Sequence, residues 1–364
     1  MKTGTTAIAG ALVHTSLAST MSHRSSTGLA SLGAARGMKV GIQSSAGRFS
    51  QWVLGEFLRD NFNMITPPLK WTSIRPKPDQ YEFVEADREV AFSKAHELAI
   101  HGHNLCWNGS NPAWFSSVLS KQNARDYLND YIKTVVGRYR GQVDSWDVVN
   151  EPIAIWNHRP DGLRSGPWLD IIGPDYIDLA FQATQGADPS CLRTLNLNGC
   201  EEQSSSSVEQ VRITSLNLVK TLLKRGVPIQ AVALEAHLDA PWRPNDVAYL
   251  DFLRSLRDTG LQVYISELDV NDTAIPGPAS HVEDAVAQTY SSYLKDVLSV
   301  IAIERLIFWS CSDRFDWYGS LAETQPRWRR ADGQLHHLGL TDLNFSPNPA
   351  YYAVCKVLKA NREK

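Results

Sequence analysis

The chain alternates short apolar runs with longer amphipathic segments from residue 38 to its C-terminus. Eight of the short runs have the length and apolar content of buried strands. They lie at residues 38–43, 61–66, 102–107, 145–151, 192–198, 229–238, 261–270 and 303–310. The longer segments repeat apolar residues at three- and four-residue spacing, the pattern of helices that cover a sheet. Five of them span residues 85–100, 124–141, 207–226, 282–300 and 349–363.

This alternation predicts an α/β fold in which each strand is followed by a helix. Several helical segments end near a glycine just before the next strand, at Gly141, Gly226 and Gly260, as helix C-termini often do. Eight such units favour a parallel (β/α)8 TIM barrel, a single domain over residues 28–364. The competing doubly wound sheet usually carries a Gly-x-Gly-x-x-Gly turn after its first strand, and "GIQSSAGRFS" lacks that spacing.

Length and charge narrow the function classes. A chain of 364 residues is within the range of one large α/β barrel. The net charge of −3 and the lack of any Lys/Arg run give no surface for a polyanion, so nucleic acid is not an expected partner. No apolar run reaches the roughly 18–20 residues of a membrane span. We expect a monomer that binds no membrane, no cofactor and no metal.

The N-terminus and the cysteines bear on the cellular compartment. Residues 1–27 are expected to be a tail, because "MKTGTTAIAGALVHTSLAST" has one Lys before a stretch of small and apolar residues. This is the pattern of a weak export signal, which predicts a secreted or periplasmic protein. The five cysteines show no Cys-x-x-Cys spacing and are odd in number, so no zinc site or complete disulfide framework is implied. Cys191 and Cys200 could pair in an oxidising compartment, or could be two small apolar residues in a core.

Candidate chemistry lies where the predicted strands end, because barrel enzymes carry their active sites at the C-terminal ends of the strands. Two carboxylates, Glu151 and Glu267, end nonadjacent strands and can meet over the barrel mouth. The residues at or just after the strand ends are Trp107, Asn108, Asn150, Glu151, Glu235, His237, Glu267, Asp269 and Trp309. The alternative for any one glutamate is a solvated position without function.

Two glutamates over a cleft lined by tryptophans suit glycoside hydrolysis. One carboxyl group protonates the leaving oxygen, and the other attacks or activates water. Eleven Trp and twelve Tyr are a heavy aromatic load, which a core can absorb but which also suits stacking on flat sugar rings.

Six segments stand in order along the chain at or near the predicted strand ends: "FNMITPPLKW", "GHNLCWNGSNPAW", "WDVVNEP", "LEAHL", "ISELDV" and "FWSCSDRFDW". With these segments the sequence resembles glycoside hydrolase family 10, the retaining endo-β-1,4-xylanase barrels. The resemblance runs from about residue 31 to residue 354. "WDVVNEP" is similar to the acid/base segment of that family, and "ISELDV" is similar to its nucleophile segment. "FNMITPPLKW", "GHNLCWNGSNPAW", "LEAHL" and "FWSCSDRFDW" resemble further sugar-binding segments in the same order.

This resemblance implies a retaining β-glycoside hydrolase that acts on xylan or a similar β-linked glycan through a covalent glycosyl-enzyme. Glu151 would be the acid/base and Glu267 the nucleophile. The remaining implied roles are a contact to the sugar 2-hydroxyl from Asn150, orientation of Glu267 by His237, a glycone contact from Lys70, and cleft walls from Trp309 and Trp317. Trp107, Asn108 and Glu235 are further expected substrate-binding residues.

Four departures from the family pattern fall on the glycone side. "TPPLKW" lacks the usual Glu-Asn pair before Lys70, Asn108 stands where the family has His, and Ser110 stands where it has Gln. Glu235 replaces a usual Gln. A site that hydrogen-bonds one hydroxyl pattern rejects others strongly, so we expect plain xylan to be a poor substrate.

Two rival functions remain. His101-x-His103 has the spacing of a metal-ligand pair, which would suit a metal-dependent barrel hydrolase. These histidines begin the predicted third strand, so they are expected near the barrel bottom in a structural role. The other rival is a carbohydrate-binding protein that keeps the barrel and has lost turnover.

Overall fold

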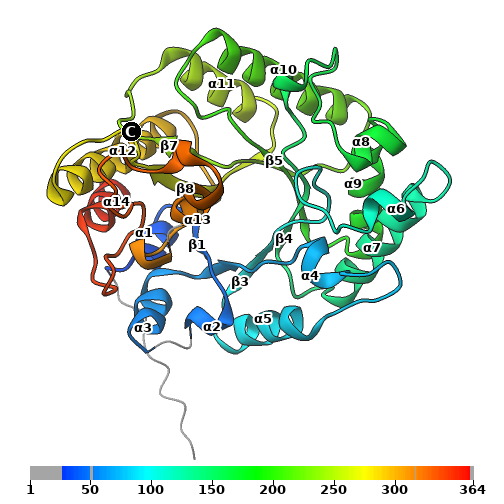
Figure 1. Ribbon diagram of the computed structural model, residues 1–364, viewed down its shortest axis with the longest axis horizontal. Coiled ribbons are helices and arrows are strands. Elements are labelled where there is room, and N and C mark those ends of the chain that lie inside the picture. Colours follow the sequence, from blue (N-terminus) through cyan, green and yellow to red (C-terminus); the bar gives the residue numbers. More distant parts are fainter. Residues whose placement is uncertain (1–26, 50–51, 316, 361–364) are drawn as a thin grey trace, which may run out of the picture.

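Eight parallel strands close into a barrel in the computed structural model, which describes residues 27–49, 52–315 and 317–360 (Figure 1). The order around the barrel is β1, β2, β3, β4, β5, β6, β8 and β9, and β9 pairs with β1 again. The barrel strands are β1 (Lys39–Gln43), β2 (Met64–Thr66), β3 (Ala99–Gly102), β4 (Ser145–Asn150), β5 (Leu192–Leu197), β6 (Ala231–Leu234), β8 (Gln262–Asn271) and β9 (Arg305–Phe308). The predicted fold class is confirmed.

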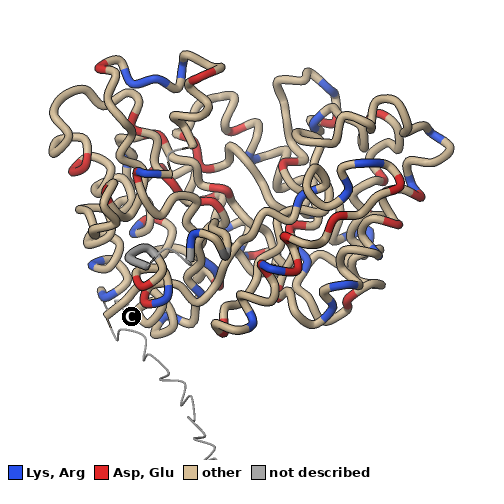
Figure 2. The backbone as a smooth tube through the Cα atoms, turned by 60° about the horizontal axis from the view of Figure 1, so that its bottom comes forward, with Lys and Arg blue, Asp and Glu red and all other residues tan. Residues whose placement is uncertain are grey.

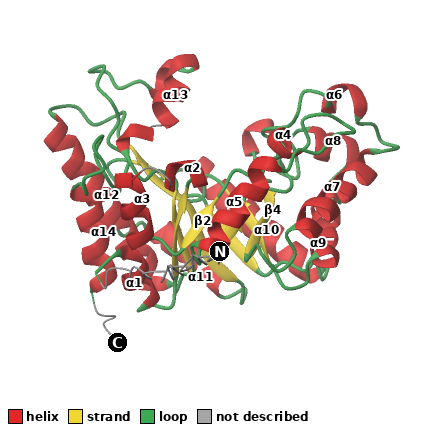
Figure 3. Cartoon of the chain, turned by 90° about the horizontal axis from the view of Figure 1, so that it is seen from below, coloured by secondary structure: helices red, strands yellow, loops and turns green. Residues whose placement is uncertain are grey.

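Helices surround the strands on the outside (Figures 1 and 3). The longer ones are α3 (Trp52–Asn61), α5 (Val84–Ala95), α7 (Ala124–Arg138), α9 (Tyr176–Ala187), α10 (Ser206–Lys224), α11 (Val247–Arg257), α12 (Ala279–Val300) and α14 (Pro349–Lys359). The shorter ones are α1 (Leu29–Ala34), α2 (Ala46–Phe49), α4 (Trp71–Ile74), α6 (Phe115–Val118), α8 (Pro167–Ile172) and α13 (Trp317–Thr324), with 3-10 turns η1 (Ile155–Asn157), η2 (Asp313–Phe315) and η3 (Pro326–Trp328). The five predicted helices are present.

The prediction for the third strand is wrong. Residues 102–107 were expected, whereas β3 spans Ala99–Gly102 and α5 ends before it at Ala95. The strand was hidden because His101 points into a polar barrel interior, so the apolar pattern there is broken. Residues 103–107 leave the ladder but stay beside β4, where the Leu105 N–H donates to the Asp147 carbonyl at 2.9 Å.

The predicted run 229–238 is divided into two strands. β6 ends at Leu234, and β7 (His237–Asp239) pairs with the second half of β8, with His237 opposite Asp269. Between them Ala236 has a φ of +63°, a left-handed conformation that breaks a strand. This bend brings Glu235 and His237 to the C-terminal end of the barrel, beside Glu267.

Over the residues that the structure describes, the five cysteines form no disulfide bonds, and the charged residues form no block of one sign. All five cysteines are buried and free, so the possible Cys191–Cys200 pair is not formed; the two residues flank opposite ends of β5. Lys and Arg are scattered among Asp and Glu along the chain (Figure 2). No helix in the described part of the chain has the length and apolar character needed to span a membrane. The expected export signal falls on residues 1–26, outside the described residues.

Close packing between β3 and β4 can be tested at Gly102. A Cβ atom there would lie 2.3 Å from the ring of Trp146, which is fully buried. Gly102→Ala is therefore expected to reduce the free energy of unfolding by about 1–3 kcal/mol and to lower Tm in a thermal melt. In the matched control Gly137→Ala, on α7, a Cβ meets nothing within 4 Å. That variant should be neutral or more stable because Ala favours helix, and an equal loss in both would contradict the packing argument.

Candidate active site

A column of hydrogen-bonded polar side chains fills the barrel interior below the two glutamates. Arg305 on β9 donates to the Ser145 hydroxyl on β4, and Ser145 contacts His101 Nδ1 at 2.6 Å. Nε2 of His101 lies 3.0 Å from Asp147, which is 1% exposed. Although burial alone would raise the pKa of Asp147, the two neighbouring histidines, His101 and His103, hold it at about 2.

Glu267 lies on β8 at the top of this column and is 5% exposed. One of its oxygens, Oε1, is 3.8 Å from His103 Nδ1, and the other, Oε2, is 3.4 Å from His237 Nε2. Burial alone would raise the pKa of Glu267. The charge of His103, together with the hydrogen bond and charge of His237, outweighs burial and lowers the pKa. The arrangement keeps Glu267 ionised, as a nucleophile requires.

His237 connects Glu267 to a second buried carboxylate. Its Nδ1 lies 2.8 Å from Asp269 Oδ1, and Asp269 also accepts a bond of 2.6 Å from the indole N–H of Trp317. Burial opposes charge on His237, but Asp269 and Glu267 raise its pKa well above the usual range. A protonated His237 therefore lies between two carboxylates and fixes the position of Glu267.

Glu151 directly follows β4 and is in the opposite electrostatic situation. Its Oε2 lies 2.5 Å from Arg164 Nη2, and Arg164 Nε donates to its backbone carbonyl at 2.9 Å. Burial raises the pKa of Glu151, the charge of Arg164 offsets part of this rise, and the charge of Glu267 adds to it. A carboxyl group with a raised pKa beside one with a lowered pKa is the arrangement of a general acid and a nucleophile.

The side chain of Asn196, at the β5 position opposite Asn150, links the two strand ends. Its amide nitrogen donates to Asn150 Oδ1 at 2.7 Å and to Glu267 Oε1 at 2.8 Å. Asn150 Nδ2 lies 3.4 Å from Glu151 Oε1. Hydrogen bonds thus run from Glu151 through Asn150 and Asn196 to Glu267. The predicted convergence of the two glutamates is explained by neighbours on three strands.

Aromatic rings lie beside the two histidines that flank Glu267. The ring of Trp309 is 5.2 Å from His103 and 6.2 Å from His237, and the ring of Trp317 is 5.1 Å from His237. Trp317 begins α13, which stands above the strand ends on one side of the molecule (Figure 3). Trp309 and Trp317 therefore wall the site on the side of His237.

Lys70 and Trp107 form a separate group. The Lys70 ammonium is 5.4 Å from the Trp107 ring centroid, within cation–π range. Lys70 is placed by the next residue, Trp71, which stacks on Tyr131 at 3.6 Å and donates its indole N–H to the Leu105 carbonyl at 2.7 Å. The fixed backbone holds Lys70 above the aromatic cluster.

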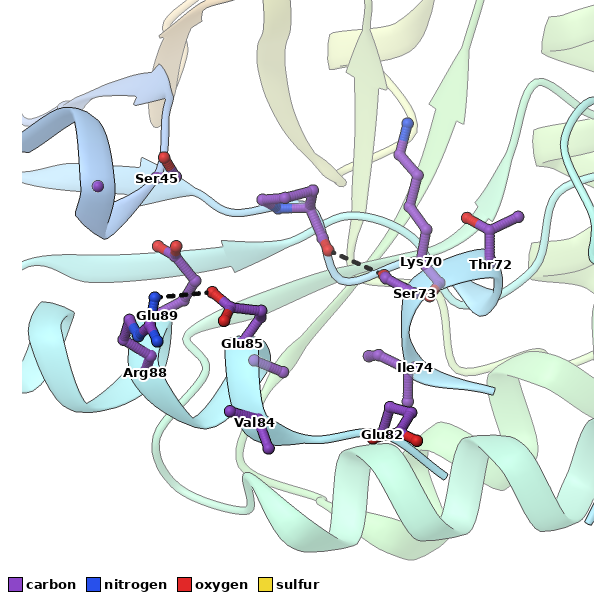
Figure 4. A pocket seen from close by; sticks show the side chains of 13 residues that line it. Ser45, Lys70, Thr72, Ser73, Ile74, Glu82, Val84, Glu85, Arg88 and Glu89 are labelled. Atoms are coloured by element: carbon purple, nitrogen blue, oxygen red, sulfur yellow. Dashed lines mark hydrogen bonds and ion pairs between the residues drawn. The ribbon is translucent and has the colours of Figure 1, made fainter. Parts of the chain in front are cut away.

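A cavity of about 540 Å³ borders Lys70. It runs between Ser45, the Lys70–Ile74 segment and the start of α5, and Figure 4 shows Lys70 extending away from the α5 side chains. On α5, Arg88 pairs with Glu85 at 3.1 Å. Neither Glu151 nor Glu267 lines this cavity.

The Asn108 side chain is engaged with the loop after β4. Its Nδ2 donates to the Arg164 carbonyl at 3.3 Å, and its Oδ1 accepts from the Trp168 N–H at 3.1 Å. The substrate contact expected for Asn108 would compete with both bonds. Ser110, in the same segment, is half-buried. Asn108 thus helps to position the loop that carries Arg164.

His103 was expected at the barrel bottom, and that placement is wrong. It directly follows β3 at the C-terminal end, because β3 begins three residues earlier than predicted. His103, Asp147 and Glu267 offer ligand atoms within 4.8 Å of one another. However, His103 Nδ1 bonds Asp147 at 3.0 Å and its Nε2 contacts Asn104 at 3.2 Å. These contacts favour a hydrogen-bonded network over a metal site.

Sequence reasoning missed two residues that contact the glutamate side chains, Arg164 and Asn196, as well as Asp147 and Arg305 in the column below them. Arg164 lies in a loop 13 residues after Glu151, where charged residues are usual and carry no signal. Asn196 interrupts the apolar pattern one residue before β5 ends at Leu197, and a polar residue near a barrel strand end could have marked it as a candidate.

Comparison with known proteins identifies the family. A model described as Glycosyl hydrolase family 10 matches residues 28–357. The chain belongs to glycosyl hydrolase family 10.

Relatives and solved structures of family 10 agree in length and shape. Endo-1,4-beta-xylanase B of Thermotoga neapolitana is 29% identical over 310 residues, 84% of this chain and 83% of that protein. The beta-1,4-xylanase of Dictyoglomus thermophilum is 30% identical over 312 residues, 82% of this chain and 83% of that protein. The native xylanase 10B structure from Thermotoga maritima has a TM-score of 0.79 at 28% identity, covering 91% of this chain and 98% of that one. This family 10 protein is an endo-1,4-β-xylanase-like glycosidase, and the family resemblance found in the sequence is confirmed.

The ion pair between Arg164 and Glu151 leads us to predict how the pH dependence of kcat/KM changes when Arg164 is replaced. Arg164→Gln removes a charge that lowers the pKa of Glu151, so the acid group should keep its proton to higher pH. The alkaline limb of kcat/KM against pH is expected to move to higher pH, measured on a natural β-linked oligosaccharide. The control Arg159→Gln changes a half-buried arginine of the same loop that pairs with Asp161 and should leave the limb in place. A limb that moves to lower pH, or equally in both variants, would show that Arg164 does not act on Glu151.

Proposed function

We propose that this family 10 protein hydrolyses a β-linked glycan with retention of configuration, through a covalent glycosyl-enzyme on Glu267. The observation that carries the proposal is the pair of carboxyl groups with opposite pKa shifts. Despite its burial, neighbouring histidines lower the pKa of Glu267 and favour its ionised state, whereas burial and the charge of Glu267 raise the pKa of Glu151 and favour its protonated state. Retaining enzymes use two carboxyl groups in these two states.

In the first step the Glu267 carboxylate attacks the anomeric carbon while Glu151 transfers its proton to the leaving oxygen. Asn150, held by Asn196, would bond the sugar 2-hydroxyl. His237 and Asp269 keep the attacking oxygen in place. The aglycone leaves, and the sugar remains esterified to Glu267.

In the second step Glu151, now a carboxylate, takes a proton from water as the water oxygen attacks the same carbon. The ester bond to Glu267 breaks and the carboxylate is restored. Arg164 pairs with Glu151 and stabilises it in this charged state, so the ion pair assists the step in which Glu151 acts as a base.

We infer the substrate class from the names of the relatives. Those above are named as xylanases, and xylanase 10B from Thermotoga petrophila RKU-1, which has a TM-score of 0.79 at 29% identity, was solved in complex with xylobiose. We propose xylan or a xylan-like β-glycan for this chain. The cavity beside Lys70, in the segment that lacks the Glu-Asn pair, would admit a decorated glycone sugar.

The roles of the two glutamates can be separated by leaving group. Glu151→Ala is expected to keep much of its glycosylation rate on a dinitrophenyl glycoside, because that leaving group needs no proton, while losing turnover of natural glycans. Its deglycosylation should be slow, and azide should restore turnover by forming a glycosyl azide of retained configuration. Glu267→Ala lacks the nucleophile, so a better leaving group should not rescue it.

Rates and product configuration are measured by stopped assay and NMR. The assignment fails if both variants respond alike to leaving group and azide, or if Glu267→Ala is the one rescued with retention. A wild-type protein that binds glycans but hydrolyses neither glycans nor aryl glycosides would instead be a carbohydrate-binding barrel.

Glycone selectivity is tested by substrate preference. We expect higher kcat/KM on decorated xylan oligosaccharides than on plain β-1,4-xylan, because the glycone side differs from the usual pattern. The differences are the missing Glu-Asn pair before Lys70 and the residues Asn108, Ser110 and Glu235. Product analysis on plain xylan, decorated xylan and mixed β-glucan gives the comparison. Equal activity on plain and decorated xylan would show that these departures are neutral.

A further inference from the structure

Glu235 is a third carboxyl group in the catalytic centre. It follows β6 and is 5% exposed. The titratable groups that act on it are Glu151 after β4, Glu201 in the loop after β5, His237 on β7 and Glu267 on β8. Three of these four are acids, so the local environment disfavours another negative charge.

The hydrogen bonds around Glu235 do not compensate a charge. In the described part of the chain, the carboxyl group of Glu235 has one hydrogen bond, from the Asn196 amide nitrogen 3.5 Å from Oε1. That nitrogen lies closer to Asn150 Oδ1, at 2.7 Å, and to Glu267 Oε1, at 2.8 Å. A carboxamide nitrogen carries two hydrogens, and the two shorter contacts use both. Glu235 is left without a full-strength N–H donor.

The cationic side chains of the site pair with Glu151 and Glu267 and not with Glu235. Arg164 pairs with Glu151 and His237 lies against Glu267. Within the described ranges, no Lys, Arg or His makes an ion pair with Glu235 at 4.0 Å or less. A buried carboxylate with neither a cation nor a strong donor takes up a proton instead of remaining charged.

We propose that Glu235 keeps its proton while the enzyme works, and that this neutral carboxyl group serves as a hydrogen-bond donor beside the nucleophile. The electrostatics agree, since burial first, and then the charges of Glu151 and Glu267, raise the pKa of Glu235 well above its usual range. A neutral carboxyl group has one O–H donor and one carbonyl acceptor. It can therefore replace the carboxamide that the family resemblance leads one to expect at this position.

Loss of this proton would change the reaction in two ways. The donor would become an acceptor, and a negative charge would be added next to Glu267. Glu235 thus sets an upper pH limit on hydrolysis that is separate from the limit set by the acid Glu151. This inference rests on the proposed function for its kinetic consequence, but the protonation of Glu235 itself can be measured without activity.

The kinetic test uses a dinitrophenyl glycoside, whose first step needs no acid, so that ionisation of Glu151 is not limiting. With the wild-type protein, kcat/KM is expected to fall by about tenfold or more as pH rises through the ionisation of Glu235. Glu235→Gln cannot ionise, and its kcat/KM, relative to its own value at acid pH, should stay level over the same range.

A matched control is Glu201→Gln, which removes a neighbouring buried carboxyl group whose burial raises its pKa to about 7. The alkaline fall should persist in this variant. A fall of the same size and position in wild type and Glu235→Gln, or its loss in Glu201→Gln alone, would overturn the role of Glu235. Ionisation of His237 is common to all three proteins and cancels in the comparison.

A second measurement is independent of catalysis. A glutamate whose pKa is higher in the folded than in the unfolded state makes stability fall with pH between the two values, starting near about 4.3. The difference in Tm between Glu235→Gln and wild type should be constant below about pH 4 and then grow in favour of the variant. A constant difference from pH 4 to 9 would overturn the proposal. If no protein hydrolyses any glycoside but the difference grows, the proposed function fails while the proton on Glu235 stands.

Discussion

Keeping a carboxylate charged inside a protein is the constraint on which the whole site depends. An isolated buried charge is very unfavourable, so charge can persist only where cations and donors surround it. The column from Arg305 through Ser145, His101, Asp147 and His103 supplies this from below. Its members come from β9, β4 and β3, so the charge on Glu267 depends on closure of the barrel and on the register of those strands.

A second consequence is that the two carboxyl groups proposed for catalysis have pKa values shifted in opposite directions, although both are glutamates. Glu267 has histidine neighbours on two sides, whereas Glu151 has one arginine at the edge of the site. Arg164 belongs to a loop, while the partners of Glu267 belong to strands or directly follow them. The proposed nucleophile Glu267 is therefore held by the strands of the barrel, whereas the pKa of the proposed acid Glu151 is lowered by a loop residue, and loops tolerate sequence changes more readily.

The number of N–H groups on the Asn196 amide accounts for the different protonation inferred for Glu235. Asn196 has two N–H groups and three oxygens within reach. The two N–H groups donate to Asn150 and Glu267, so neither is left for a strong bond to Glu235. A single amide thus favours charge on one carboxyl group and neutrality on its neighbour, even though both lie at strand ends and both are buried.

The sequence alone determined the α/β barrel, because alternating apolar periods of strands and helices are local properties of the chain. It also determined Glu151 and Glu267 as a pair, because strand ends of a parallel barrel must meet at one face. Only the tertiary structure decided their charge states, since Arg164, His103 and Asn196 act across distances in sequence that no local pattern records. The misplaced third strand has the same origin. His101 is a polar strand residue whose partner, Asp147, lies on the next strand. A search for apolar runs misses such a residue, because the partner comes near only in the folded chain.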